Sequence, residues 1–168
     1  MSEALPARFQ GVSELDEFLS RPSARLTAFM AELDGDLMVI GAGGKIGPTM
    51  ARMAVRAVAA AGVSKRVMAV DVAPLAALAA DGIETYQCDM LDLDAVAALP
   101  RAKNVVYMIG RKFGSTGAES LTWAVNCLPA YHTARAFTGS RISAFSTGCV
   151  YPVMDIRSGG ATESTPAD

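Results

Sequence analysis

Residues 41–47 have the residue types and the spacing to hold a phosphate group. Gly41, Gly44 and Gly47 recur at three-residue intervals directly after the apolar run Leu37–Ile40. Gly41 permits a tight turn, Gly44 lets the backbone approach a pyrophosphate, and Gly47 allows close packing of a helix on the strand. The N-terminus of that helix offers free N–H groups to phosphates. We therefore predict a nucleotide-binding loop, rather than a merely tight turn, which also includes Gly43, Lys45 and Ile46.

Asp71 is the next residue whose type and place favour nucleotide chemistry. It ends the apolar run 66–71, where a carboxylate can accept hydrogen bonds from the ribose hydroxyls of an adenosine. A carboxylate there would repel a 2′-phosphate, which favours NAD over NADP. Two alternatives stay open: Asp71 could cap a turn, and Lys45, Lys65 and Arg66 lie near enough in sequence to serve NADP.

Alternating strand and helix patterns must position these residues. The strands expected from apolar runs are 37–40, 66–71, 83–87, 105–109 and 142–146, and the helices between them cover about 50–61, 74–80, 93–99 and 118–137. Strands separated by helices of this length form parallel βαβ units with right-handed crossovers. The pattern predicts an α/β fold, a Rossmann-type doubly wound parallel sheet with 37–40 as a central strand.

Residues 1–35 differ from this alternation. Two short helices are expected there, one over 12–19 and one that Ser23 caps and that runs through Leu33. We interpret 1–35 as a helical lead-in packed on the edge of the sheet, and 36–168 as the dinucleotide-binding domain.

Composition limits the classes of function. Hydrophobic residues make up 51% and charged residues 19% of the 168 residues, with a net charge of −2. This balance shows no basic footprint for nucleic acid or an anionic membrane. No apolar run is long enough to cross a bilayer, and the first ten residues lack the apolar core of a signal peptide. The spacing of the three cysteines suits neither a metal site nor a disulfide framework, so we expect a cytoplasmic protein with reduced, mostly buried thiols and no metal.

Taken together, these motifs resemble the extended short-chain dehydrogenase/reductases, the NAD-dependent epimerase/dehydratase family. The glycine spacing is that family's form of the fingerprint. Cys88, Asp89 and Asp92 resemble its acidic signature after the third strand, and 144–152 is similar to its stretch with the active-site hydroxyl. The resemblance implies that Asp89 contacts the adenine, assisted by the backbone of Met90.

The resemblance also assigns roles nearer the reacting end of the cofactor. Ile109 and Gly110 stand where the family usually has two alanines beside the cofactor, and Asn126 matches a helix asparagine that supports the active-site strand. Thr147, four residues before Tyr151, takes the hydroxyl role. The same helix as Asn126 contains Pro129, which should kink or break it.

The family's catalytic Tyr-x-x-x-Lys pair is expected a little beyond 163–166, and none of the four tyrosines here has a lysine four residues later. We therefore expect a truncated chain, the NAD-binding part of an enzyme that transfers hydride to or from a nucleotide-sugar or a related hydroxyl or carbonyl compound. By itself this part should be inactive. The partners implied are a small-molecule substrate and a second copy of the chain, since members often dimerise through the helix that carries Asn126.

Other classes of function stay open beside this one. A non-catalytic dinucleotide sensor or interaction module would need the same loop. A methyltransferase dependent on S-adenosylmethionine also uses a glycine loop and a strand-end acid, although 144–152 argues against it. The basic, glycine-rich segment 111–117 is placed to touch a phosphorylated substrate or the cofactor, or it is a solvated mobile loop. His132, the single histidine, is expected to be a surface or core side chain.

Overall fold

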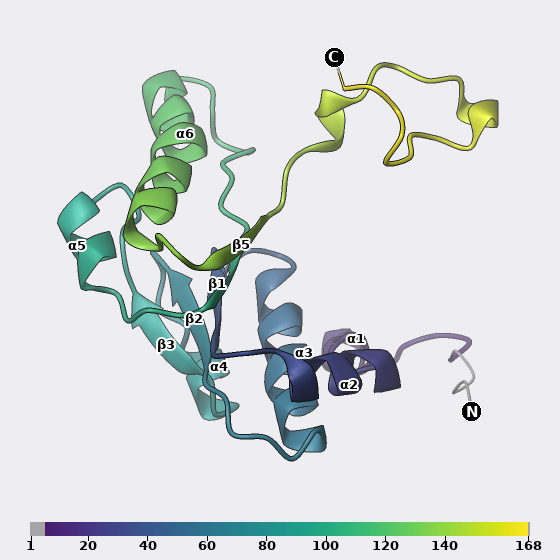
Figure 1. Cartoon of the computed structure of the whole chain (residues 1–168). Helices are drawn as coiled ribbons and strands as arrows, with labels where there is room; N and C mark the ends of the chain where they lie inside the picture. Colours follow the sequence, from purple (N-terminus) through teal and green to yellow (C-terminus); the bar gives the residue numbers. More distant parts are fainter. Residues whose placement is uncertain (1–5, 168) are drawn as a thin grey trace.

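The computed structural model describes residues 6–167 and has a five-stranded parallel sheet at its centre (Figure 1). The order of the strands across the sheet is β3-β2-β1-β4-β5, so the first strand is the central one. This arrangement confirms the predicted α/β Rossmann-type sheet. The strands are β1 Leu37–Ile40, β2 Val67–Asp71, β3 Glu84–Gln87, β4 Asn104–Tyr107 and β5 Arg141–Ala144.

The helices connect these strands and lie one or two residues from most of the expected bounds. They are α1 Val12–Leu19, α2 Ala24–Glu32, α3 Gly47–Ala60, α4 Ala76–Ala80, α5 Leu93–Ala98 and α6 Glu119–Ala136, followed by the short 3-10 turns η1 Gly148–Val150 and η2 Ile156–Ser158. None of the described helices is long and apolar enough to cross a membrane.

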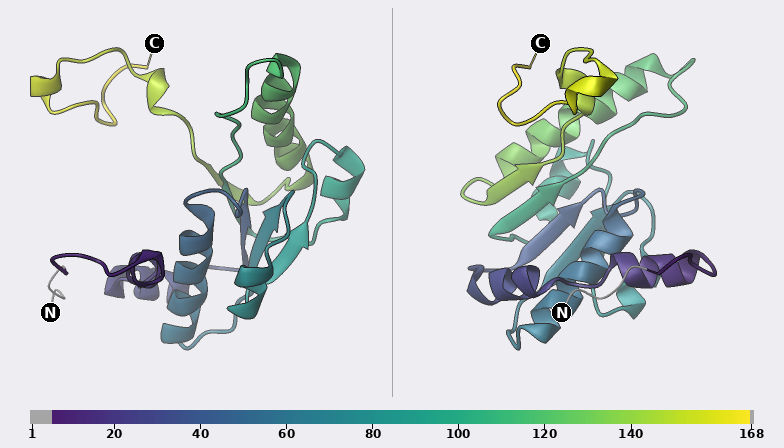
Figure 2. Two further views of the ribbon diagram at one scale, coloured as in Figure 1. Left: turned by 180° about the vertical axis from the view of Figure 1, so that it is seen from behind. Right: turned by 90° about the vertical axis from the view of Figure 1, so that its right-hand side faces the viewer.

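Helices cover both faces of the sheet, and the alternation of side chains along each strand supplies both cores (Figure 2). On β1, Val39 faces the layer of α2, α3 and α4, where it packs with Met30 and Leu78. Met38 and Ile40 point to the opposite layer, with α5 and α6. Since both faces of the sheet are covered at its centre, β1, β2 and β4 are mostly buried and mostly apolar, whereas the edge strands β3 and β5 are not.

The lead-in helices pack on α3, not on the edge of the sheet as expected. Ser23 caps α2 as predicted, because its side chain accepts a hydrogen bond from the N–H of Leu26. Met30 is 2% exposed and joins the core between α3 and the sheet. On α3, Arg56 Nη1 donates to Ser20 Oγ at 2.8 Å and thereby holds the end of α1. Burial of Met30 therefore directs α2 to a face of the domain that α3 already covers.

Pro129 does not break α6, which runs from Glu119 to Ala136 with the proline inside it. A proline in a helix removes one backbone donor, so the helix must be stabilised by other contacts. Pro129 is fully buried, and its carbonyl oxygen accepts a bond from the hydroxyl of Thr133 at 2.7 Å. This packing offsets the lost hydrogen bond.

The prediction of mostly buried thiols is wrong. Cys88 is buried, whereas Cys127 on α6 and Cys149 in η1 are exposed. Burial raises the pKa of the Cys88 thiol, which keeps it protonated.

The segment after β5 extends away from the sheet (Figure 1). Its first backbone bond joins the N–H of Phe145 to the carbonyl of Tyr107 at 2.9 Å. All four residues of β5, an edge strand of the sheet, are exposed.

Candidate functional site

The glycine loop connects the carboxyl end of β1 to the N-terminus of α3. Gly41 has a φ of +85°, and a Cβ there would lie 3.0 Å from the backbone nitrogen of Ile109. The N–H groups of Gly41 and Ala42 donate to the carbonyl of Val70 at 2.9 and 3.1 Å. The turn is thus held between β2 on one side and the end of β4 on the other.

Gly47 and Gly44 lack side chains for different reasons. A Cβ on Gly47 would lie 2.3 Å from the carbonyl oxygen of Ala42, so only glycine lets α3 begin this close to the turn. At Gly44, a Cβ would approach only the carbonyl oxygen of Gly41, at 3.4 Å. Gly44 therefore lies on the open side of the loop, where a ligand can reach its backbone.

The N-terminus of α3 is suited to an anion. Its N-cap residue, Ile46, makes no side-chain hydrogen bond, and the first turn of the helix contains no acidic residue. Lys45 and Ile46 are both exposed. The first N–H groups of a helix have no partner within the helix, so an oxyanion can take their hydrogen bonds and gain from the helix dipole.

Asp71 lies at the end of β2 beside this loop. Its Oδ2 accepts a hydrogen bond from the N–H of Gly43 at 2.8 Å, and its Oδ1 accepts one from the N–H of Ala73 at 3.0 Å. A Cβ on Gly43 would lie 2.8 Å from the Asp71 carboxyl carbon, so this approach requires glycine. The carboxylate both caps its own turn and orders the glycine loop, and it keeps lone pairs for further donors.

Arg66 and Lys65 lie at the amino end of β2, whereas Asp71 lies at its carboxyl end. Arg66 directly precedes β2, and its Nε forms an ion pair with Asp36 at 2.8 Å. Asp71 is five positions further along the extended chain, a distance of about 16 Å. Of the three basic residues that left NADP open, only Lys45 is at the glycine loop.

The β3–α5 loop carries Asp89 and Met90 to the same edge. The N–H of Cys88 bonds the carbonyl of Asp71 at 2.9 Å, which connects this loop to the end of β2. Asp89 Oδ1 accepts a bond from the N–H of Leu91 at 2.9 Å. Met90 is 4% exposed and packs in the core on the α5 and α6 side of the sheet.

His132 fixes the carbonyl of Met90, a role that the sequence did not indicate. Its Nδ1 lies 2.9 Å from that oxygen in a buried contact. Because a carbonyl oxygen only accepts, His132 carries its proton on Nδ1 and donates it. A single histidine on a helix has no spacing signal that could have predicted this contact.

Asn126 holds the segment that follows β4. Its Oδ1 accepts from the N–H of Arg111 at 2.8 Å, and its Nδ2 donates to the carbonyl of Arg111 at 3.1 Å. Gly110 precedes Arg111, and a Cβ on Gly110 would lie 3.8 Å from Asn126 Oδ1. The amide therefore orders the backbone after Ile109, where the resemblance places the cofactor.

Thr147 lies beyond the end of β5 and is exposed. Its hydroxyl oxygen accepts a bond from the N–H of Cys149 at 3.2 Å and caps η1. None of the hydrogen bonds within 6–167 connects Thr147 to the glycine loop, Asp71 or Asp89. The structure thus brings the predicted adenosine-side residues together and leaves this hydroxyl apart from them.

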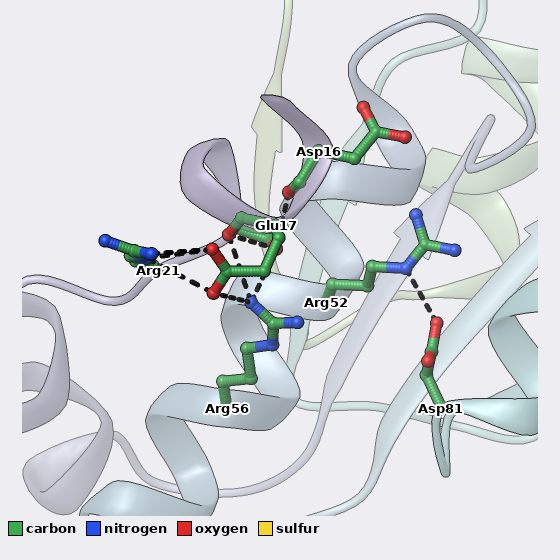
Figure 3. Close-up of polar contacts among 7 residues, drawn as sticks. Asp16, Glu17, Arg21, Arg52, Arg56 and Asp81 are labelled. Carbon is green, nitrogen blue, oxygen red and sulfur yellow. Dashed lines mark hydrogen bonds and ion pairs between the residues drawn. The ribbon is translucent and has the colours of Figure 1, made fainter. Parts of the chain in front are cut away.

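A cavity of about 460 Å³ lies between α1 and α3, and none of the candidate site residues described above lines it. Figure 3 shows the polar contacts of its charged residues. Both of its arginines are paired: Arg52 Nε with Asp81 at 2.7 Å, and Arg56 Nη1 with Glu17 at 3.6 Å. These pairs connect α3 to its neighbours, so they are structural contacts. The lining residues are Val12, Ser13, Asp16, Glu17, Ser20, Arg52 and Arg56.

Within 6–167, no three His, Cys, Asp or Glu side chains are grouped as a metal ion would require.

Comparison with solved structures shows a likeness of fold. UDP-glucose 4-epimerase of Thermus thermophilus, solved in complex with NAD, matches with a TM-score of 0.60 and 20% identity, over 79% of this chain and 44% of that chain. Triphenylmethane reductase of Citrobacter sp., complexed with NADP(H), matches with a TM-score of 0.49 and 16% identity, over 70% and 40%. No protein-family model matches the sequence, and no curated protein matches it significantly.

The chain thus has the fold of part of that epimerase. It spans less than half of the epimerase's length.

Proposed function

We propose that this chain is the NAD-binding part of an enzyme that transfers hydride between nicotinamide and a hydroxyl or carbonyl substrate. The observation that carries this proposal is the 2.8 Å contact between Asp71 Oδ2 and the N–H of Gly43. This contact holds the Asp71 carboxylate beside the glycine loop that leads to the uncapped N-terminus of α3, which supports a role for Asp71 in binding the ribose. The strand order reverses between β1 and β4, which adjoin this loop. The fold of the epimerase, solved with NAD, supports the same assignment.

The residues present fit such a cofactor. The pyrophosphate would be held by the start of α3 and by Gly44, Lys45 and Ile46. Asp71 would accept hydrogen bonds from the hydroxyls of the adenosine ribose. The β3–α5 loop, with Asp89 and the backbone of Met90, would border the adenine. The segment Ile109–Gly110, which Asn126 orders, would flank the nicotinamide half. When bound, the nicotinamide supplies the hydride chemistry.

NAD is favoured over NADP on the same geometry. A 2′-phosphate would meet the Asp71 carboxylate, while Arg66 is paired with Asp36 at the far edge of the sheet. Lys45 alone would have to offset that repulsion. We propose NAD as the cofactor on this balance of charges.

For the substrate we propose a nucleotide-sugar or a related hydroxyl or carbonyl compound, with Thr147 donating a hydrogen bond to its oxygen. A positioned proton-transfer group typically contributes ~10²–10⁴-fold to such reactions. An unactivated threonine hydroxyl is a poor acid or base near neutral pH, so we expect little or no turnover by these 168 residues alone.

The test is an assay of nicotinamide absorbance with a panel of nucleotide-sugars. It would be run on this chain and on a longer form that continues past Asp168 and contains a Tyr-x-x-x-Lys pair. We expect turnover by the longer form only, and a loss of turnover in its Thr147→Ala variant. Fast turnover by the 168 residues would contradict the proposal that this chain binds the cofactor but lacks the proton-transfer group. An unimpaired Thr147→Ala variant would remove this residue from the mechanism. A longer form that binds NAD but has no such pair would favour the sensor.

A further inference from the structure

The loop between β4 and α6, residues 111–117, combines charge with backbone freedom at the edge of the sheet that carries the site. Arg111 and Lys112 share this segment with two glycines and with the hydroxyls of Ser115 and Thr116. The loop begins two residues after Ile109, whose backbone nitrogen would lie 3.0 Å from a Cβ on Gly41. Its start therefore adjoins the glycine loop.

The backbone of Arg111 is held in place, but most N–H donors of its guanidinium have no hydrogen-bond acceptor among the described residues. Asn126 bonds both its N–H and its carbonyl, as described above. Its Nη2 donates to the carbonyl of Gly114 at 2.8 Å, which is the single protein acceptor for this guanidinium among the described residues. Its Nε is buried and has no hydrogen-bond partner. Most N–H donors of this guanidinium thus have no acceptor among the described residues, so a ligand that supplies acceptors would stabilise this site.

The positive charge of the loop is also unbalanced. Arg21, Arg52 and Arg66 each form an ion pair with a carboxylate, whereas neither Arg111 nor Lys112 does so within 6–167. The nearest acid in sequence, Glu119, uses its Oε1 to accept the N–H of Gly117 at 2.9 Å. That bond lowers the pKa of Glu119 and holds the start of α6. Glu119 forms no ion pair with either cation of the loop in the part of the chain that the structure describes.

We infer that residues 111–117 bind an oxyanion, a phosphate or a carboxylate, of the substrate. The planar guanidinium of Arg111 matches the geometry of such groups and Lys112 adds a second charge. The start of α3 already offers a place for the single pyrophosphate of a dinucleotide, so a second anion site at the end of β4 belongs to the other reactant. That it is the substrate's anion rests on the proposed function, whereas the anion site itself does not.

The experiment is a titration of the ¹⁵N-labelled 168-residue chain with inorganic phosphate and, separately, acetate, in the presence and absence of saturating NAD. Amide shifts would be followed at 111–117 and at 44–48, so that the two loops are read independently. Arg111→Met removes the guanidinium and keeps the backbone bonds to Asn126. Lys103→Met, at the opposite end of β4, removes an equal charge and serves as the matched control.

We expect saturable shifts at 111–117 with one or both anions in the NAD-bound protein, weakened about tenfold by Arg111→Met and unchanged by Lys103→Met. Anion binding at 111–117 in a protein that does not bind NAD would support the anion site and refute the proposed function. Three results would overturn the inference: no saturable shift at 111–117, equal loss in the Lys103→Met control, or loss of NAD binding together with anion binding in Arg111→Met. The last would assign the loop to the cofactor. A thermal melt of each variant verifies that it is folded.

Discussion

At the scale of single residues, the glycines of the loop have separable effects. Gly47 is required by packing, since a Cβ would collide with the backbone of Ala42 at 2.3 Å. Gly43 is required by Asp71, whose carboxyl carbon a Cβ would approach to 2.8 Å. Gly44 has no such neighbour, so its missing side chain matters for what binds there. The motif spacing predicted Gly44 and Gly47, whereas the constraint on Gly43 comes from Asp71, 28 residues further along the chain.

Asp71 is the residue on which cofactor preference depends. Asp71→Ala removes both the acceptor for the ribose hydroxyls and the bond that orders Gly43. We expect NAD affinity to fall by about 10- to 150-fold, because one charge-assisted hydrogen bond contributes roughly 1.5–3 kcal/mol. NADP affinity should fall less, since the repulsion of its 2′-phosphate is lost too.

Isothermal titration calorimetry of NAD and of NADP against Asp71→Ala and the unaltered chain measures these changes in affinity. Asp89→Ala is the comparison, because it also removes a strand-end carboxylate but should leave the ratio of NAD to NADP affinity unchanged. Equal losses for NAD and NADP in Asp71→Ala would contradict the role given to Asp71.

Tyr107 carries a buried hydroxyl that destabilises the fold, which the sequence could not reveal. The residue is 6% exposed in the core, and its hydroxyl is buried without a hydrogen-bond partner. Burial also raises the pKa of this phenol. We expect Tyr107→Phe to increase the free energy of unfolding by about 1 kcal/mol, because the desolvated hydroxyl is removed and the packing is kept.

Chemical denaturation followed by circular dichroism tests this expectation. Tyr86→Phe is the matched control, since Tyr86 donates to Glu84 at 3.0 Å and should gain nothing from the change. A loss of stability in Tyr107→Phe would show that the hydroxyl has a partner.

The limits of sequence reasoning are clear from particular residues. His132 and Arg66 act through contacts 42 and 30 residues away, with Met90 and Asp36, and no local pattern encodes them. The expected break at Pro129 is absent because helix propensity does not include the burial of the proline. The exposed thiols of Cys127 and Cys149 were missed for a related reason, since the apolar character of cysteine says little about which face of an element it occupies.

At the scale of elements, the central strands were predictable because each is a short, mostly apolar run bounded by turn residues, whereas the edge strands β3 and β5 are only partly apolar. The place of α1 and α2 was not, because an amphipathic helix indicates that one face is buried but not against what. Their contact with α3 depends on Met30 and on the bond from Arg56 to Ser20.

The amino ends of β1 and β2 are joined by Asp36, which makes stability depend on pH. Burial raises the pKa of Asp36, but hydrogen bonds from the N–H and guanidinium of Arg66 together lower it more, so the pKa lies below its ordinary value of 3.8. A lowered folded-state pKa means that the carboxylate stabilises the fold at pH values above 3.8. This contribution is lost as the pH falls through the lower, folded-state value.

Asp36→Asn should therefore lower the free energy of unfolding at about pH 6 by an amount on the order of 1 kcal/mol, since the pair is partly exposed. Below about pH 3 the difference from the unaltered chain should shrink. Urea denaturation at both pH values measures the two differences. A difference that does not depend on pH would mean that the charge of Asp36 does not stabilise the fold.

At the scale of the whole molecule, the strand order β3-β2-β1-β4-β5 reverses between β1 and β4, and open α/β sheets bind ligands at the carboxyl ends of the strands at such a point. Four segments follow the carboxyl ends of these parallel strands: the glycine loop, Asp71, the β3–α5 loop and residues 111–117. The fold alone is shared with an epimerase over 44% of its length. Whether this edge binds a dinucleotide is thus the question on which the proposed function depends.

The most direct measurement is a calorimetric titration of the 168-residue chain with NAD, NADP and S-adenosylmethionine under identical conditions. We predict saturable binding of NAD with one site per chain, weaker binding of NADP, and no binding of S-adenosylmethionine. Tighter binding of NADP would contradict the role of Asp71. Binding of S-adenosylmethionine alone, or of none of the three, would contradict the central claim that this edge of the sheet is an NAD site.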